Sequence, residues 1–350
     1  MRSNYDVLGE HIRLVDFRNK DEVTNTVLGI SINKEFMPSV ANVVGTDLSR
    51  YKLIQKGMFA CNPMHVGRDE RLPIALYKDD IPAIVSPAYF MFEIIDPTIL
   101  DMDYLMMWFR RPEFDRECWF MTDGSVRGGI TWDDLCRIRI PIPPIEKQRS
   151  IVKAYQTITD RIVLKRKINE NLEAMLIAVF FDTFSSKEIA ERATLSELMS
   201  FGNGKSRPKT DGTIPVYGGN GVLSYTDQYN IENAILIGRV GAYCGSVYLE
   251  QGICWVSDNA IFAKSKVSTD EFFDYFLLKS LNLFNHHVGT GQQLLTQEIL
   301  NNIEVAKPDY EQIEVFNEKA KAVYESITDN KSEIIRLQEL SDLLLSRLVG

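Results

Sequence analysis

Two long stretches of the chain repeat apolar side chains at alternating steps of four and three residues, a spacing that keeps one face of a helix apolar. No proline or glycine occurs between Ile145 and Phe184, so roughly 38 residues can form one helix about 57 Å long at ~1.5 Å per residue. Its apolar seam is expected to consist of Ile151, Tyr155, Ile158, Ile162, Lys165, Asn169, Leu172, Leu176 and Val179. The second seam is expected to consist of Ile313, Phe316, Ala320, Val323, Ile327, Asn330, Ile334, Leu337, Ser341, Leu344 and Leu348. Helices this long need a packing partner, and we expect these two to pack on each other.

Polar residues interrupt each seam near its middle. Lys165 and Asn169 interrupt the first seam, and Asn330 interrupts the second. If the helices pack antiparallel, these side chains meet in one layer. A buried Asn lowers stability but penalises every register that places it against hydrocarbon. The sequence therefore predicts an antiparallel pair with its register set by Lys165, Asn169 and Asn330.

The two helices end two copies of a longer internal repeat. Matching residues around the helix starts are 165 positions apart, as in Thr131 and Thr296. Further upstream, the segments "VSPAYFMF" and "VSDNAIFA" match at an offset of 171, which implies six additional residues in the first copy. The order of features is the same in both copies, which indicates a duplicated unit of a globular part followed by a long helix.

The predicted fold class is α+β, with two similar α/β modules separated by two long antiparallel coiled-coil helices in a pseudo-two-fold repeat. We expect a first module at residues 1–140, a first helix at 141–184, a second module at 185–308 and a second helix at 309–350. Such a chain would resemble a dumbbell.

Within the modules, strands are expected where β-branched and aromatic residues concentrate, at "NTVLGISI", "AIVSPAYFMFEI", "NAILIGRV", "GSVYLEQGICWV" and "NAIFAKS". Helices are expected at "DMDYLMMWFRRPEF" and "DEFFDYFLLKSLNLF". The segment "GMFACNPMHVGRDERLP" predicts an exposed loop. Thr131 and Asp134 predict a capping box. The glycines of "YGGNG" permit backbone conformations that other residues avoid.

Length and composition agree with two to three globular domains, since the chain has 350 residues, 45% of them hydrophobic. The longest apolar run, "MLIAVFF", is far shorter than the ~20 residues of a membrane span, and the charged start does not resemble a signal peptide. The five cysteines form no CxxC pair, which argues against structural zinc or disulfides. We therefore expect a cytoplasmic protein without a membrane partner.

A net charge of −9 ordinarily counts against a nucleic-acid partner. The charge is unevenly distributed, however. Lys205, Arg207 and Lys209 fall in a segment without acids, "RIVLKRK" is also basic, and residues 309–329 hold six acids against two lysines. Each run could equally be a solvated face, so charge alone does not decide the partner.

The sequence lacks the motifs of the common enzyme classes. "GNGKS" is not a phosphate-binding loop, because Met199 stands where that motif needs its first glycine. The four histidines have no metal-ligand spacing, and "ACNPM" lacks the second proline and the aromatic residue of an NPPY motif. No GxSxG or HExxH motif occurs. We therefore predict no catalytic, cofactor or metal site in this chain, although acid/base pairs assembled in space leave no motif.

The order of motifs resembles that of the DNA specificity subunits of type I restriction-modification systems. The resemblance spans nearly the whole chain and is carried mainly by "IPIPPIEKQ", "YGGNG" and "IGRVG", whereas "AKPDYEQ" departs from its first-copy counterpart by placing Asp309 where a proline stood. It implies a non-catalytic subunit whose two target-recognition domains each read half of a bipartite site in double-stranded DNA. It also implies docking to two methyltransferase subunits and, through them, to restriction (translocase/nuclease) subunits. The methyl donor and ATP would bind to those partners.

Candidate DNA-contacting residues follow from polar side chains on glycine-supported loops, which suit phosphate and base-edge contacts. They are Asn62, Arg68, Ser125, Arg127, Lys205, Arg207, Lys209, Tyr217, Asn220, Arg239, Gln292 and Gln293. Each is equally well explained as an ordinary loop residue. Lys165 could snorkel toward the adjacent basic cluster or reach DNA between the half-sites. Two other functions stay open, the specificity module of a related restriction-modification system and a coiled-coil scaffold that binds no DNA.

Overall fold

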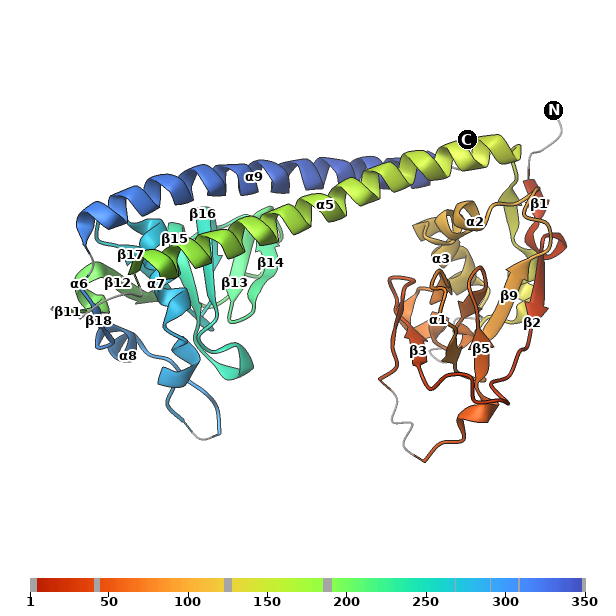
Figure 1. Cartoon of the computed structure of the whole chain (residues 1–350), viewed down its shortest axis with the longest axis horizontal. Coiled ribbons are helices and arrows are strands. Elements are labelled where there is room, and N and C mark those ends of the chain that lie inside the picture. Colours follow the sequence, from red (N-terminus) through yellow and green to blue (C-terminus); the bar gives the residue numbers. More distant parts are fainter. Residues whose placement is uncertain are drawn as a thin grey trace. The chain divides into compact units, whose positions relative to one another are not determined.

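A computed structural model describes residues 5–40, 45–122, 128–184, 191–267, 269–289, 291–307 and 309–347. The chain divides into two compact units, one of Met1–Leu164 with Glu333–Gly350 and the other of Lys165–Ser332. Each unit joins one α/β module to parts of two long helices, α5 (Ile145–Phe184) and α9 (Tyr310–Ser346). Figure 1 labels these elements.

The module of the first unit contains two small four-stranded sheets. One has the order β2 (Ile12–Val15), β9 (Phe90–Ile94), β6 (Phe59–Cys61), β7 (Ile74–Leu76), with all neighbours antiparallel. The other has the order β4 (Phe36–Pro38), β3 (Val27–Ile30), β8 (Ala83–Val85), β5 (Lys52–Ile54), with β3 and β8 parallel. A separate pair, β1 (Tyr5–Val7) and β10 (Arg139–Pro141), leads into α5. The short helices are η1 (Leu8–Glu10), η2 (Leu48–Arg50), η3 (Pro63–His65), α1 (Val66–Asp69), α2 (Met102–Phe109), α3 (Pro112–Phe120) and α4 (Trp132–Arg137).

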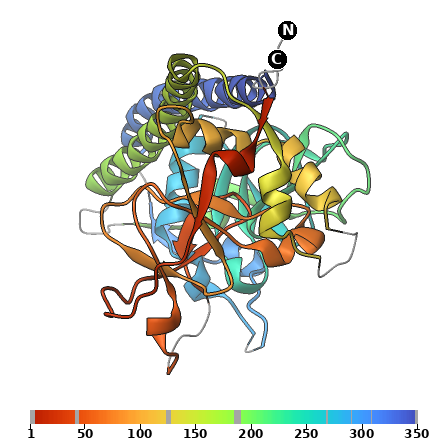
Figure 2. The same ribbon diagram turned by 90° about the vertical axis from the view of Figure 1, so that its right-hand side faces the viewer.

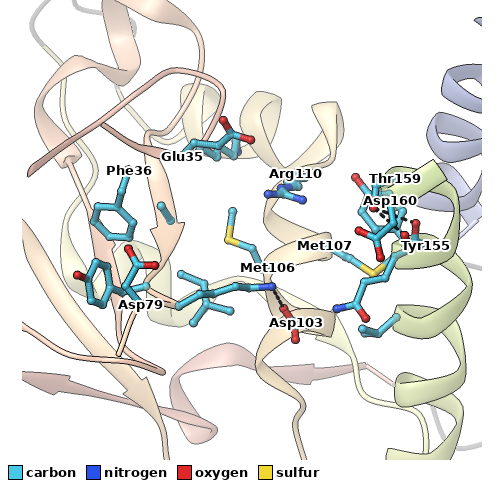
Figure 3. A pocket seen from close by; sticks show the side chains of 17 residues that line it. Glu35, Phe36, Asp79, Asp103, Met106, Met107, Arg110, Tyr155, Thr159 and Asp160 are labelled. Atoms are coloured by element: carbon cyan, nitrogen blue, oxygen red, sulfur yellow. Dashed lines mark hydrogen bonds and ion pairs between the residues drawn. The ribbon is translucent and has the colours of Figure 1, made fainter. Parts of the chain in front are cut away.

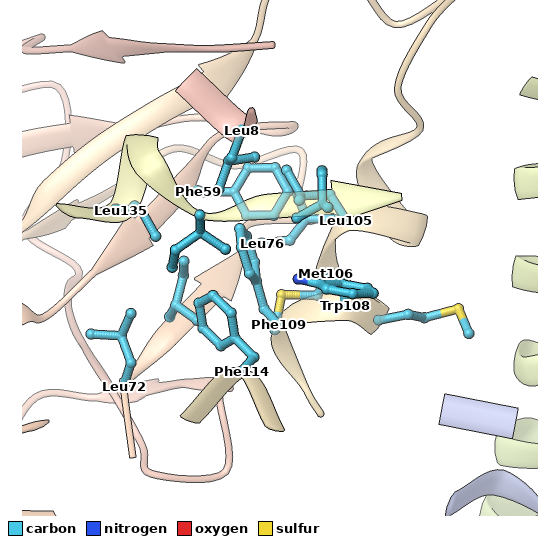
Figure 4. Close-up of a cluster of buried hydrophobic side chains, with 14 of the residues drawn as sticks. Leu8, Phe59, Leu72, Leu76, Leu105, Met106, Trp108, Phe109, Phe114 and Leu135 are labelled. Carbon is cyan, nitrogen blue, oxygen red and sulfur yellow. The ribbon is translucent and has the colours of Figure 1, made fainter. Parts of the chain in front are cut away.

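The core of this unit is built around α2, whose residues from Tyr104 to Phe109 are all buried. Figure 4 shows the aromatic and aliphatic side chains that gather there, and the Phe59 ring stacks on Phe92 with centroids 5.0 Å apart. Val152 and Tyr155 of α5 belong to the same cluster. Hydrophobic burial therefore attaches the start of the long helix to the first module.

The second unit contains one six-stranded sheet. Its order is β12 (Met199–Asn203), β17 (Ala260–Ser265), β15 (Ile231–Gly238), β16 (Val247–Val256), β13 (Ile214–Gly218), β14 (Gly221–Thr226), and only β13 and β16 are parallel. A separate pair, β11 (Arg192–Thr194) and β18 (Glu304–Ala306), leads into α9. The short helices are α6 (Leu195–Leu198), η4 (Gly241–Tyr243), α7 (Glu271–Ser280), η5 (Leu283–His286) and α8 (Gln297–Asn301).

An aromatic cluster joins both long helices to α7 in the second unit. Phe180 of α5 packs on Phe273 and Phe276 of α7, at 5.8 and 6.1 Å between centroids. Phe316 of α9 contacts Phe180 at 5.5 Å and Phe276 at 5.5 Å. This arrangement makes α7 the counterpart of α2.

The long helices pack antiparallel within each unit, as the seams predicted. In the second unit Phe180 lies against Phe316 while Asn169 contacts Asn330, so higher numbers on α5 meet lower numbers on α9. In the first unit Arg161 pairs with Glu333 at 2.5 Å. Figures 1 and 2 show the helices side by side. The seam residues are buried or half-buried, apart from Leu348, which is outside the described residues.

The polar interruptions of the two seams meet in one hydrogen-bonded layer. Lys165 Nζ donates to Asn330 Oδ1 at 2.8 Å, and Asn330 Nδ2 donates to Asn169 Oδ1 at 2.8 Å. Asn169 Nδ2 donates to the carbonyl of Ile327 at 3.4 Å. The predicted contact is confirmed, and its role in setting the register stays a prediction.

The repeat offset of 165 is confirmed for the elements that lead into the long helices. Strand β10 begins at Arg139 and β18 at Glu304, and α5 begins at Ile145 and α9 at Tyr310, so both pairs keep the offset of 165. The additional residues of the first copy fall where α3 stands in place of the shorter η5. Thr131 forms the predicted capping box with Asp134.

Two local expectations need correction, and a third holds at one glycine. The segment expected to be an exposed loop begins with β6, a buried strand, because Phe59, Ala60 and Cys61 are apolar, and η3 and α1 follow it. The helix expected from residue 101 is broken into α2 and α3, because Pro112 can begin a helix but cannot continue one. In "YGGNG" only Gly221 has a positive φ, of 78°.

Candidate nucleic-acid interface

Four loops of the second module meet, and they carry several of the predicted contact residues. The Arg239 N–H donates to the Asn259 carbonyl at 3.0 Å, and the Leu295 N–H donates to the Arg239 carbonyl at 2.9 Å. The Gly241 N–H donates to the Gln293 carbonyl at 3.1 Å. The hydroxyl of Ser246 donates to the carbonyl of Gly219, beside Asn220, at 2.6 Å. Residues far apart in sequence are thereby held together by backbone hydrogen bonds.

Arg239 is the most constrained cation of this loop cluster. It follows β15 directly, and its side chain is half-buried. Nη1 donates to the Asp258 carbonyl at 3.4 Å, whereas Nε is buried and has no acceptor among the described residues. A guanidinium carries five N–H donors in a planar fork, so most of its donors are free for a ligand. Such a group can contact a guanine edge or a phosphate.

The amide candidates occupy the surface of the same cluster. Asn220 is exposed in the turn between β13 and β14, and Gln292 is exposed in the loop before α8. Gln293 is half-buried. Asn and Gln side chains carry one acceptor and two donors, which suit the edge of adenine.

Tyr217 has a structural partner. It lies within β13, and its hydroxyl donates to Glu250 Oε2 at 2.9 Å. Burial and the neighbouring Glu250 carboxylate raise the pKa of Tyr217 above its ordinary value. The hydroxyl is thus already bonded inside the sheet, although the ring edge stays half-exposed.

The basic segment runs beside this loop cluster. The Lys205 N–H donates to the Val256 carbonyl at 2.9 Å, and Lys205 forms an isolated parallel bridge with Ser257. The side chains of Lys205, Arg207 and Lys209 are exposed, and no described residue forms an ion pair with them. Unpaired cations on an extended segment are suited to phosphate contacts.

The first module brings two candidates close to the start of α4. Asn62 caps η3 by accepting from the Met64 N–H at 3.2 Å, and Arg68 pairs with Asp69 at 2.7 Å. The Gly67 N–H donates to the Gly128 carbonyl at 3.0 Å, which places the segment after residue 127 beside α1. Ser125 and Arg127 lie outside the described residues.

Comparison with known proteins identifies the family. The sequence pattern of the family described as "Type I restriction modification DNA specificity domain" matches residues 75–174 and 188–336, which is more than half of the chain. The chain belongs to this family. The two matched segments fall in the two copies of the repeat, as a duplicated specificity-domain protein requires.

Individual relatives support the family and the fold. The EcoprrI type I restriction enzyme specificity subunit of Escherichia coli is 22% identical over 166 residues, which cover 45% of this chain and 41% of that relative. The matched part is therefore less than half the length of that relative.

A crystal structure of a type I restriction-modification S subunit from M. genitalium has a TM-score of 0.60 at 16% identity, covering 99% of this chain and 96% of that one. A structure from work on complex assembly and conformational transition of the type I R-M system has a TM-score of 0.51 at 17% identity, covering 99% and 97%. At these identities the structures show the shared fold.

Two residues of the loop cluster were missed by reasoning from the sequence. Tyr243, in η4, is 53% exposed, and Asn259 is exposed in the turn between β16 and β17. Both occur in turns between predicted strands, in "RVGAYCGS" and "WVSDNA". The turn composition was a usable signal, since polar and aromatic residues at strand ends of a specificity-domain module can face DNA.

A cavity of about 520 Å³ in the first unit lies between α2, β7 and α5 (Figure 3). Its charges are of both signs, and Lys78 Nζ pairs with Asp103 Oδ1 at 2.5 Å.

Among the described residues, no group of three or more His, Cys, Asp or Glu side chains is arranged to hold a metal ion. None of the described helices is long and apolar enough to cross a membrane.

Proposed function

We propose that this chain is the DNA specificity subunit of a type I restriction-modification complex, in which each module reads one half of a bipartite site in double-stranded DNA. Residues 1–140 and 185–308 would be the two target-recognition domains, and residues 141–184 and 309–350 the spacer helices. The observation that carries the proposal is the duplication itself, because each of the two family matches runs from one α/β module into the long helix that follows it.

Recognition would divide between two kinds of contact. The unpaired cations Lys205, Arg207 and Lys209 would hold phosphates and position the second module. Arg239, Asn220, Gln292 and Gln293 would face base edges, because hydrogen bonds between loops constrain their backbone. Asn62, Arg68, Ser125 and Arg127 would serve the first module in the same way. Tyr217 would contribute its ring rather than its hydroxyl.

The antiparallel helices would act as a spacer of defined length. Half-sites on one face of DNA are about one helical turn, ~34 Å, or a small multiple apart. A flexible linker could not select one such distance, whereas two packed helices can. Lys165, Asn169 and Asn330 would keep the helices in one register.

The chain itself would carry out no chemistry. Two methyltransferase subunits would bind to it and hold the methyl donor, and restriction subunits with the ATP site would join through them. No cofactor is assigned to this chain, and the complex would act in the cytoplasm.

The test is to express the chain together with a type I methyltransferase subunit from its host and to sequence the methylated DNA. A bipartite methylated motif that disappears without this chain is the expected result. Methylation that continues unchanged without the chain, together with no DNA binding by the purified complex, would favour the scaffold function instead.

A further inference from the structure

A cavity of about 660 Å³ opens in the second unit between the start of α7 and the first turns of α9. Four acids line it: Asp270, which precedes α7, Glu271 at the start of α7, and Glu314 and Glu318 of α9. Lys321 is the one base among its lining residues. Phe272, Tyr310 and Val267 add apolar surface. We call this the acidic pocket. It lies in the acidic run at residues 309–329, to which the proposed function assigns no role.

The four acids of this pocket form no ion pair with any described residue, although Lys264 lies close enough to Glu271 to lower the pKa of that carboxyl. The ion pairs described in the second unit involve other residues. Burial raises the pKa of both Asp270 and Glu271. The dipole of α7 can stabilise these two at its beginning, but Glu314 and Glu318 lie beyond the first turn of α9, where that effect has faded.

Asn317 is a second feature of the acidic pocket that indicates a ligand. It lines the pocket and is 7% exposed, and its Oδ1 accepts from the Phe273 N–H at 2.8 Å. Its Nδ2 has no acceptor among the described residues. A buried N–H without an acceptor is destabilising, so an occupant that offers an acceptor is favoured.

In the first copy of the repeat, the corresponding amide is that of Gln148, and all of its polar atoms have hydrogen-bond partners. Gln148 Oε1 accepts from the Asp101 N–H at 2.9 Å at the start of α2. Its Nε2 donates to the carbonyls of Ile99 and Pro143, at 2.8 and 2.7 Å. The donor left over at Asn317 is therefore a feature of the second copy alone.

The acids that α9 contributes to this pocket also have no acidic counterparts on α5. At the offset of 165, Glu314 and Glu318 correspond to Arg149 and Lys153, which are exposed on α5. At the offset of 171, Asp270 and Glu271 correspond to Ile99 and Leu100. The two copies thus carry opposite charge at two positions of the long helices, and apolar residues replace the acids at the other two.

We propose that the acidic pocket binds an arginine- or lysine-bearing polypeptide segment of a partner protein, and that the equivalent surface of the first copy does not. The acids would hold the cationic head, and Phe272 and Tyr310 would pack on its aliphatic stem. Asn317 Nδ2 would donate to a main-chain carbonyl of the segment. A metal ion or a polyamine offers no such acceptor, so the unpaired amide favours a peptide. The proposal does not depend on DNA recognition and can fail while the proposed function stands.

The probe is a fluorescein-labelled Gly-Arg-Gly-Arg-Gly peptide, titrated with the full chain and followed by fluorescence anisotropy. Replacing Glu314 and Glu318 together by Gln should weaken binding about tenfold or more, because charge-assisted hydrogen bonds are lost. Lys321→Gln should strengthen binding, since it removes the one competing base. This variant keeps the test decisive if the double variant folds poorly, which thermal unfolding will show.

Matched controls separate the pocket from general acidity. Glu325→Gln with Asp329→Asn removes the same charge from exposed positions of α9 outside the pocket and should leave binding nearly unchanged. The same peptide with citrulline for arginine should bind weakly. Asn317→Asp keeps the acceptor for Phe273 but removes the donor, so it should weaken peptide binding relative to methylguanidinium binding. Equal weakening by the control pair, equal binding of the citrulline peptide, or competition by spermidine as effective as by unlabelled peptide would overturn the proposal.

Discussion

Removing the central amide of the helix pair should destabilise the second unit measurably. In Asn330→Ala, Lys165 loses its acceptor at 2.8 Å and Asn169 loses its donor at 2.8 Å. A hydrogen bond to a charged group contributes about 1.5–3 kcal/mol and a neutral one about 0.5–1.5. The full sum is about 2–4.5 kcal/mol, and because all three side chains are only half-buried, we expect a smaller loss of about 1–3 kcal/mol in the free energy of unfolding.

Leucine at position 330 should change the free energy of unfolding by a different amount. Asn330→Leu loses the same two hydrogen bonds but adds apolar side chain to a seam between Ile327 and Ile334. Burying a leucine contributes about 1.5–3 kcal/mol, so the net change should be close to zero. The alanine and leucine variants should therefore differ by about 2 kcal/mol, with alanine less stable.

Amide hydrogen exchange in α5 and α9 is the appropriate assay, because a chain of two units need not unfold in one step. The protection of amides near residues 169 and 330 should fall in Asn330→Ala and stay near its original value in Asn330→Leu. Asp329→Ala, an exposed neighbour, serves as the control and should change protection by less than about 0.5 kcal/mol. If Asn330→Ala behaved like this control, the three polar residues would be solvated side chains and not a structural layer.

Three further predictions follow. Replacing Lys205, Arg207 and Lys209 together by Ala should weaken binding to all DNA sequences alike and make its salt dependence shallower, by about one unit of slope per lost phosphate contact; an unaltered slope in salt titrations would show that this segment faces away from DNA. Exchanging residues 1–140 for the first module of another family member should change one half of the methylated motif, and a change in the other half, seen by methylome sequencing, would refute independent modules. Burial raises the pKa of Asp274 to about 7, so its contribution to stability is greatest below the unfolded pKa of about 4 and is lost as pH rises toward 7. Asp274→Asn should remove this loss in urea unfolding measured across that range, whereas an unchanged pH profile would mean that the carboxyl ionises freely.

The long-range organisation of the fold could be predicted because it depends on periodicity. The seams of α5 and α9 and their antiparallel packing follow from apolar spacing and from the places of Lys165, Asn169 and Asn330. These signals survive in one sequence since each spans many residues. Short elements were less predictable, and β6 was mistaken for loop because turn formers surround its three apolar residues.

The candidate interface could be predicted only in part. Turn chemistry marked Asn220, Arg239 and Gln293 as loop residues, but their proximity depends on hydrogen bonds between strands that are distant in sequence. No local pattern indicates such pairing. The turn composition around Tyr243 could have marked it as a loop residue, but its place among the other loops could not be predicted.

The two copies differ in how a side-chain amide of the long helix is hydrogen-bonded, and this difference has a physical cause. Both copies hold the first turn of a core helix with a side-chain amide from a long helix, Gln148 in the first and Asn317 in the second. The amide of the second copy lies one helical turn later than the repeat offset requires, because residue 313, which corresponds to Gln148, is the buried Ile313. The longer Gln148 reaches two additional carbonyls, whereas Asn317 reaches none. The duplicated fold therefore kept the hydrogen bond that attaches module to helix while it left a donor free beside four acids. Because this surface differs between the two copies, a partner that binds the acidic pocket would distinguish the second copy from the first.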